Sequence, residues 1–243
     1  MRYAVLGDIH GNWEALDAVL RDMEGRGVDR HLCVGDIVGY GADPRKCVRC
    51  VQEMEFVCVA GNHDQAVVGR LDVSYFNAHA REAVEWTRQR ISVAQAEYLA
   101  EQPLIASVDG VTIGHGTVHQ PERFGYLETV FAAQLSFHAM TTPVAFLGHS
   151  HVPITFLENE GHDSVTYTQS TEVELRHVTK AIVNVGSVGQ PRDDDPRACY
   201  AVYDAGAHTV ELRRIEYDIE KAQARIRKAG LPEVLAARLA LGR

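Results

Sequence analysis

Seven side chains that can bind a metal ion lie at or just after the ends of short apolar runs, and each run closes on glycine. The seven are Asp8, His10, Asp36, Asn62, His115, His149 and His151. Carboxylate oxygens, an amide oxygen and imidazole nitrogens together suit Mn, Fe or Zn, and the set lacks the thiolates of a structural zinc site. The sequence therefore predicts a metal site built from several separate segments.

The donor count is enough for two ions. Two four-coordinate ions need about eight ligand positions, which seven residues supply if one carboxylate bridges. One ion would take Asp8, His10, Asp36 and His151; the other would take Asp36, Asn62, His115 and His149. We expect two divalent ions as the cofactor. The choice among Mn, Fe and Zn stays open, because the affinity order favours Zn over Mn in almost any such site and availability decides.

Strands must position these donors. Six short, β-branched runs end in glycine: Tyr3–Gly7, His31–Gly35, Phe56–Gly61, Val111–Gly114, Val144–Gly148 and Ile182–Gly186. Such runs are typical of buried strands. Helical patterns follow the first two, over Trp13–Met23 and Asp43–Glu53. Alternating strands and helices indicate an α/β fold, in which chemistry gathers at the carboxyl ends of the strands.

The rest of the chain predicts further elements around this sheet. From about 65 to 103 the pattern is helical without a strand run, over Asn77–Arg90 and Val93–Glu101, so we expect a helical lid above the strand ends. Residues of about 154–179 alternate and predict hairpins that continue a second sheet. A hairpin over Cys199–Asp204 and His208–Tyr217 and a helix from Asp218 to Lys228 should follow. We expect one domain over 1–243.

Composition limits the class of protein. The 243 residues carry 24 Lys and Arg against 33 Asp and Glu, a net charge of −9, which argues against a long nucleic acid as partner. The five Cys are odd in number and have no framework spacing, which indicates reduced thiols and a cytoplasmic location. No run reaches the roughly 18 apolar residues of a membrane span. The oligomeric state stays open.

Five blocks resemble a known family in their order and content. They are GDIHG (7–11), GDIVGYG (35–41), GNHD (61–64), GHG (114–116) and GHSH (148–151). This series resembles the calcineurin-like metallophosphoesterases, and the later NVGSVGQPRD (184–193) resembles their prokaryotic small-phosphodiesterase branch. The resemblance implies a four-layer α/β/β/α sandwich with a dinuclear metal centre. It also implies the two ligand sets given above.

The resemblance assigns the reaction as well. It implies attack on phosphorus by a hydroxide that bridges the two metals, with His63 as general acid or transition-state stabiliser. The adjacent Asp64 is expected to hold the His63 ring or raise its pKa. We expect a protonated His63 to meet the charge that develops on the leaving oxygen.

One block departs from the pattern of the family's protein phosphatases. Their second block resembles GDxxDRG, whose Arg grips the phosphate; here Gly39 stands at the Asp position and Tyr40 at the Arg position. Another cation could replace that Arg, and Arg123 and Arg192 are the candidates. The candidates for substrate binding are Tyr40, His119, Arg123 and Arg192.

These observations predict a metal-dependent phosphoesterase for a small phosphodiester, a nucleotide or a dinucleotide polyphosphate. A phosphomonoesterase or phosphoprotein phosphatase is the alternative within the class, and the missing Arg argues against it. A non-catalytic metal-binding scaffold is the alternative of another class. It would be expected to have lost a ligand or His63, and the chain retains all of them.

Overall fold

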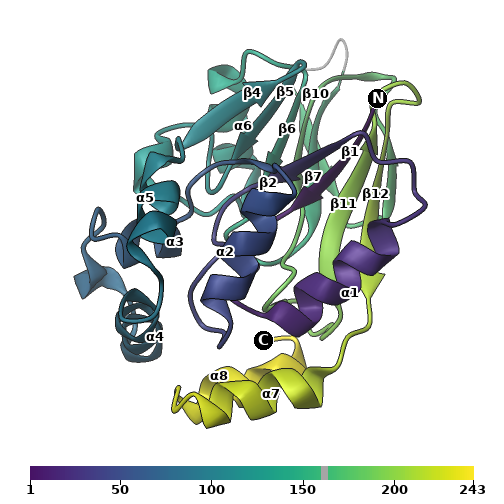
Figure 1. The fold of residues 1–243 in the computed structure, drawn as a ribbon. Helices are drawn as coiled ribbons and strands as arrows, with labels where there is room; N and C mark the ends of the chain where they lie inside the picture. The colour runs from purple at the N-terminus through teal and green to yellow at the C-terminus, as the bar shows by residue number, and fades with distance from the viewer. Residues whose placement is uncertain (160–163) are drawn as a thin grey trace.

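The computed structural model describes residues 1–159 and 164–243. Its strands form two mixed sheets (Figure 1). In spatial order, the first contains β3 (Val57–Cys58), β2 (Arg30–Cys33), β1 (Arg2–Leu6), β11 (Ala198–Asp204), β12 (Thr209–Ile215) and β9 (Glu172–Glu174). The second contains β4 (Ile105–Val108), β5 (Val111–Gly114), β6 (Val144–Leu147), β10 (Val178–Asn184), β7 (Ile154–Asn159) and β8 (Val165–Thr168).

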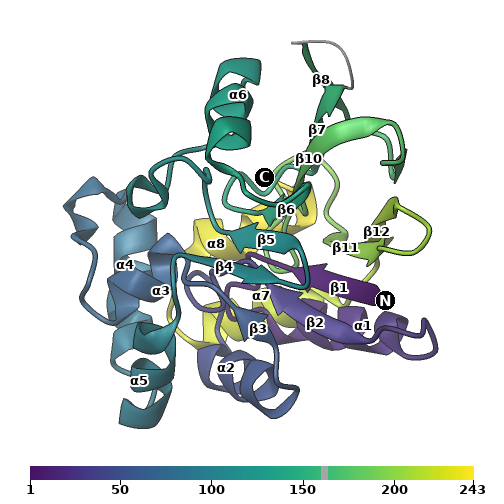
Figure 2. The same cartoon turned by 90° about the horizontal axis from the view of Figure 1, so that it is seen from above.

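Helices cover the outer faces of both sheets (Figure 2). The α-helices are α1 (Trp13–Met23), α2 (Pro44–Glu53), α3 (Asn62–Val67), α4 (Ala78–Arg88), α5 (Val93–Glu101), α6 (Val130–Ala139), α7 (Ile219–Lys228) and α8 (Glu233–Ala237). Short 3₁₀ turns are η1 (Val73–Tyr75), η2 (Pro121–Arg123) and η3 (Arg238–Leu241). Helix α1 contacts β11 and β12 of the first sheet, and α6 contacts β7, β8 and β10 of the second. The layers therefore run α/β/β/α, as predicted.

Strand β1 shows why the two sheets and the helices stack. Tyr3 and Val5 point into the apolar core between the sheets, where they join residues such as Phe146. Ala4 and Leu6 point the other way, into the core beneath α1 and α2. Successive side chains of a strand alternate between faces, so a run that is apolar throughout must be buried on both. The continuous apolar character of β1 thus places it at the centre of the sandwich.

Most of the predicted elements are present. Helices α1 and α5 have the predicted bounds, and the β11–β12 hairpin and α7 follow as expected. The side chain of Asp218 accepts a hydrogen bond from the amide of Lys221, which caps α7. Helix α6 was not predicted, because its apolar residues occur all around the helix and form no stripe.

Two predictions about insertions need correction. Residues 154–179 do not all continue the second sheet: β7 and β8 do, but β9 pairs with β12 at the edge of the first sheet. The tip of the β7–β8 hairpin, 160–163, lies outside the described residues. The 65–103 segment is free of strands, as predicted, but it is not a lid over its whole length. Helix α5 packs on α2 and α3, and only the part of the segment that precedes α5 reaches the strand ends.

No helix within the described ranges is long and apolar enough to cross a bilayer.

Candidate metal centre

The seven predicted donors meet where strands from both sheets end. Strands β1 and β2 run parallel in one sheet, and β5, β6 and β10 run parallel in the other. Asp8 and Asp36 lie just beyond the first pair, and His115 and His149 follow β5 and β6. Packing the two sheets face to face brings these edges together, so that residues 141 positions apart in the chain are in contact.

Three overlapping clusters could each hold a metal ion. Within each, the donor atoms all lie within 4.8 Å of one another. The clusters are Asp8–His10–His151, Asp36–His115–His149 and His10–Asp36–His63. The first two lie within the two predicted ligand sets. All these residues are buried.

The distances place Asp36 between the clusters. Its Oδ2 lies 3.6 Å from His10 Nε2 and 3.4 Å from His115 Nε2, while Asp8 Oδ1 lies 3.2 Å from His151 Nε2. Asn62 Oδ1 lies 3.0 Å from His115 Nε2. Every donor of the two predicted sets is thus close to others, and Asp36 is adjacent to histidines of both.

The imidazoles are oriented for a metal. Nδ1 of His10 lies 3.1 Å from the carbonyl of Val38, and Nδ1 of His151 lies 2.5 Å from the carbonyl of Gln190. A carbonyl oxygen only accepts, so each Nδ1 carries the hydrogen and each neutral Nε2 presents a lone pair. These two Nε2 atoms face each other at 3.1 Å. Two lone pairs at this distance repel, and a cation between the donors removes the conflict, so the residues fit the ions.

The local backbone is strained at the ligands. Asp8, His10, Asp36, His149 and His151 all have positive φ angles, between 50° and 71°. Residues other than glycine rarely adopt this left-handed region, and each instance costs on the order of 1–3 kcal/mol. Strain concentrated in this way is typical of functional sites, where the surrounding structure holds a side chain in place at the expense of stability.

Close packing explains why glycine is present at two positions. One is Gly61, which precedes Asn62, and the other is Gly39, where the second block departs from the pattern of the family's protein phosphatases. A Cβ on Gly61 would collide with the carboxylate of Asp36. A Cβ on Gly39 would lie 2.6 Å from Nδ1 of His63 and 3.1 Å from Nδ1 of His10. Position 39 therefore excludes an Asp side chain in this structure, because both histidine rings occupy the space.

Burial and charge shift the titration of the donors. Burial alone disfavours the ionised form of Asp36, but the neighbouring imidazoles outweigh it and hold its pKa well below the usual range. Burial lowers the pKa of His149 to about 3. At His115 burial acts in the same direction, but the charge of Asp36 outweighs it and raises the pKa to about 9. The centre therefore keeps carboxylates ionised at neutral pH without bulk water.

His63 and Asp64 differ from expectation. Burial, opposed by the charge of Asp36, lowers the pKa of His63 to about 4, so its ring is neutral at pH 7 rather than protonated. Asp64 does not hold that ring: its carboxylate accepts the backbone N–H groups of Ile37, Val38 and Gly61 at 3.1–3.3 Å. Asp64 therefore fixes the two ligand-bearing loops to each other. Nδ1 of His63 is buried without a hydrogen-bond partner among the described residues.

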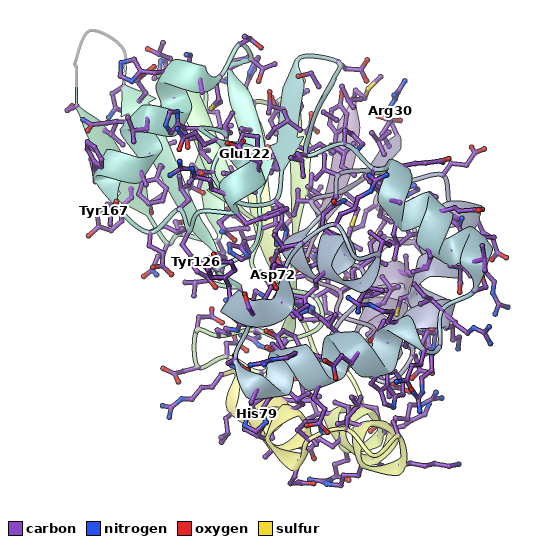
Figure 3. All side chains as sticks on the ribbon, turned by 90° about the vertical axis from the view of Figure 1, so that its left-hand side faces the viewer. Arg30, Asp72, His79, Glu122, Tyr126 and Tyr167 are labelled. Atoms are coloured by element: carbon purple, nitrogen blue, oxygen red, sulfur yellow. The ribbon has the colours of Figure 1, made fainter. Side chains whose placement is uncertain are left out.

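A cavity of about 670 Å³ opens above the centre. Three predicted substrate-binding residues, Tyr40, Arg123 and Arg192, line it together with donors of the metal clusters; His119 does not. The sequence analysis missed the rest of the lining: Leu71, Asp72, Tyr75, Phe76, Asn77, Ala80, Glu122, Phe124 and Tyr126. Figure 3 shows Asp72, Glu122 and Tyr126 on the same face of the molecule. The sequence feature that could have indicated this lining is a pair of short aromatic segments, Tyr75–Phe76 and Phe124–Tyr126.

Tyr126 illustrates what these missed residues contribute. Its ring stacks on that of His149, with centroids 4.1 Å apart and planes 12° from parallel. Half of the residue is exposed at the mouth of the cavity. By contrast, Leu99, Trp86 and Tyr98 of the lid segment do not line the cavity, and Leu99 is buried in the core.

Comparison with known proteins agrees with the geometry. A solved metallophosphoesterase from Sphaerobacter thermophilus is 40% identical, covers 100% of this chain with 99% of its own, and superposes with a TM-score of 0.88. The uncharacterized protein MJ0912 of Methanocaldococcus jannaschii is 38% identical over 99% of this chain and 98% of its own. The hypothetical protein PH1004 of Pyrococcus horikoshii, 19% identical, shares the fold with a TM-score of 0.80 and coverage of 100% and 98%.

The profile of the calcineurin-like phosphoesterase superfamily domain matches residues 1–208. This range contains every donor of the buried His/Asp clusters. The chain belongs to the calcineurin-like phosphoesterase superfamily.

Proposed function

We propose that the protein is a metal-dependent phosphodiesterase for a small substrate, such as a nucleotide or a dinucleotide polyphosphate. The cavity beside the clustered donors supports this most directly. A volume of about 670 Å³ suits a small molecule rather than a protein surface or a polymer. A net charge of −9 also disfavours a long nucleic acid.

The wall of the cavity favours a diester. Beyond the donors, Leu71, Phe76 and Tyr126 supply apolar and aromatic surface from two separate loops. A phosphodiester carries a second organic group that such a wall can cover, and an aromatic base can stack on an exposed tyrosine. A phosphomonoester has no such group.

Seven residues would hold the metal pair. Two divalent ions bound here would polarise phosphoryl oxygens and lower the pKa of a bound water. We assign Asp8, His10, Asp36 and His151 to one ion and Asp36, Asn62, His115 and His149 to the other. The hydrogen bonds from the histidine Nδ1 atoms to backbone carbonyls fix the ring orientations, so binding costs little rearrangement.

His63 would move the proton to the departing oxygen. Its ring is buried beside Asp36, and burial lowers its pKa to about 4. An anionic phosphate beside the ring favours the protonated form, so substrate binding would supply the charge state that the acid needs. Asp64 would act as a positioning residue through the loop amides that it holds.

Hydrolysis of model esters tests the proposal. The protein is stripped with chelator, refilled separately with Mn²⁺, Zn²⁺, Fe²⁺ or Co²⁺, and assayed with bis-p-nitrophenyl phosphate and p-nitrophenyl phosphate. Metal-restored turnover that favours the diester supports the proposal. Preference for the monoester would support the phosphomonoesterase or phosphatase alternative. Failure of every metal on a folded protein that binds two ions would support the scaffold alternative.

A further inference from the structure

The loop after β10 places one arginine directly against the metal centre. The amide of Arg192 donates to the carbonyl of His151 at 3.2 Å. Two residues earlier, the carbonyl of Gln190 accepts from Nδ1 of His151, and the Gln190 side chain reaches Nη2 of Arg192 at 3.0 Å. The position of this guanidinium is therefore tied to that of a predicted metal ligand.

Arg192 has no anionic partner in the described parts of the chain. None of their carboxylates lies within 4.0 Å of its guanidinium, and its contacts, Gln190 Oε1 and the Tyr40 hydroxyl at 3.4 Å, are neutral. Its Nε is buried and unpartnered among these residues. The guanidinium is half-buried and therefore partly desolvated without a counter-charge, and a bound anion would offset that cost.

Tyr40 holds the guanidinium toward the cavity. The Tyr40 ring lies against the rings of His10 and His63, with centroids 4.6 and 4.5 Å apart, and the Arg192 Cζ lies 5.8 Å from its centroid. Tyr40, His63 and Arg192 all line the cavity. Because Nη2 is engaged by neutral groups and Nε is buried, the two N–H groups of Nη1 are left for a ligand.

We propose that Arg192, positioned by Tyr40 and Gln190, binds the nonbridging oxygens of the substrate phosphate. This inference rests on the proposed function, since a phosphoester brings the anion. Arg192 would thus replace the Arg that is missing at position 40, from a different loop and with Tyr40 as its support. A planar guanidinium offers paired donors to a phosphate, which an ammonium group cannot.

The test measures binding of inorganic phosphate to Mn²⁺-loaded protein by titration calorimetry, for wild type, Arg192→Ala and Arg192→Lys. The matched control is Arg49→Ala, which removes an exposed arginine on α2 away from the cavity. We expect Arg192→Ala to raise the dissociation constant about tenfold or more, Arg192→Lys to raise it less, and the control to leave it unchanged. All variants should retain two Mn²⁺ per chain.

Phosphate binding by Arg192→Ala at wild-type affinity, with both ions retained, would overturn the proposal. If that variant loses metal or unfolds, Arg192→Lys decides: weakened binding supports the proposal, and unchanged binding overturns it. In steady-state assays, Arg192→Ala should raise KM for bis-p-nitrophenyl phosphate. A wild type that hydrolyses no ester but loses phosphate affinity in Arg192→Ala would contradict the proposed function alone.

Discussion

Five of the seven predicted metal donors combine a positive φ angle with a buried side chain. These five occupy the left-handed backbone region, where glycine would be less strained, and the polar atoms of all seven donors lie among other polar atoms rather than water. Stability is given up locally so that donors from five segments converge. This balance predicts that single changes at the centre will separate metal binding, chemistry and folding.

Replacing His63 with Ala tests its role as a proton donor. We expect turnover to fall at least about 100-fold while the metal content stays at the wild-type value, because general acids contribute roughly 10²–10⁴-fold. Steady-state kinetics and elemental analysis on the same samples measure both. Since the His63 ring also belongs to a cluster with His10 and Asp36, loss of one ion in this variant would make His63 a ligand instead.

Alanine substitutions at two glycines test why the second block departs from the pattern of the protein phosphatases. Gly39 and Gly110 both have positive φ, of 107° and 83°, but only Gly39 would place a Cβ against His63 and His10; around Gly110 there is open space. Gly110→Ala should lower the free energy of unfolding by about 1 kcal/mol and leave turnover unchanged. Gly39→Ala should destabilise the fold and, in addition, abolish most turnover, because the rings of His63 and His10 must move to make room for the Cβ. Equal activity of both variants would contradict this explanation.

At the scale of elements, the helix α1 is held to the first sheet by a half-buried charge network. Asp22 of α1 accepts from Arg213 of β12 at 2.7 and 2.9 Å and from the hydroxyl of Tyr200 of β11 at 2.6 Å. Burial opposes ionisation, but these donors outweigh it and hold the pKa of Asp22 well below its usual range. The network fixes the helix that follows the Asp8–His10 loop.

Asp22→Asn should therefore reduce stability in a pH-dependent way. A depressed folded-state pKa contributes stability above the unfolded-state pKa of about 4, and this contribution is lost as the pH falls through the folded-state value. We expect a loss of about 1–2 kcal/mol at pH 7 in urea unfolding, which shrinks steadily below pH 4. Asp17→Asn, which affects an exposed pair with Arg21 on the same helix, is the control and should cost under about 0.5 kcal/mol. An Asp22→Asn loss independent of pH would contradict the assignment.

The elements show what sequence patterns can and cannot give. A strand such as β1 is predictable because a short, continuous apolar run ends in glycine, and a helix such as α1 is predictable because its apolar residues form a stripe. Helix α6 has no stripe, and the pairing of β9 with β12 is a long-range choice that no local pattern encodes. Likewise the donors could be grouped because each follows a strand, whereas the cavity lining from η1 and from residues 122–126 depends on how loops pack.

At the scale of the whole molecule, the centre joins the two sheets. Asp8 and Asp36 come from the first sheet, and His115, His149 and His151 from the second, so ions bound between them link the halves of the sandwich. Without ions, two ionised carboxylates remain buried in a small volume. Metal binding should therefore stabilise the entire fold.

Chelation tests this coupling. At an ion concentration 100 times the dissociation constant, binding adds about 2.7 kcal/mol per site. For a chain of 243 residues this corresponds to a rise in Tm of roughly 5–10 °C per ion, which calorimetry with EDTA or with Mn²⁺ can measure. Asp36→Asn should lose most of the rise because Asp36 is predicted to serve both ions. An unchanged Tm on chelation would contradict a stabilising metal centre.

The most direct test of the account is a titration of the stripped protein with Mn²⁺, following hydrolysis of bis-p-nitrophenyl phosphate and bound metal in the same samples. We predict that activity is absent without metal and rises to a plateau at two equivalents per chain. Activity that survives complete removal of metal, or that is full at one equivalent, would contradict a two-ion centre that shares Asp36.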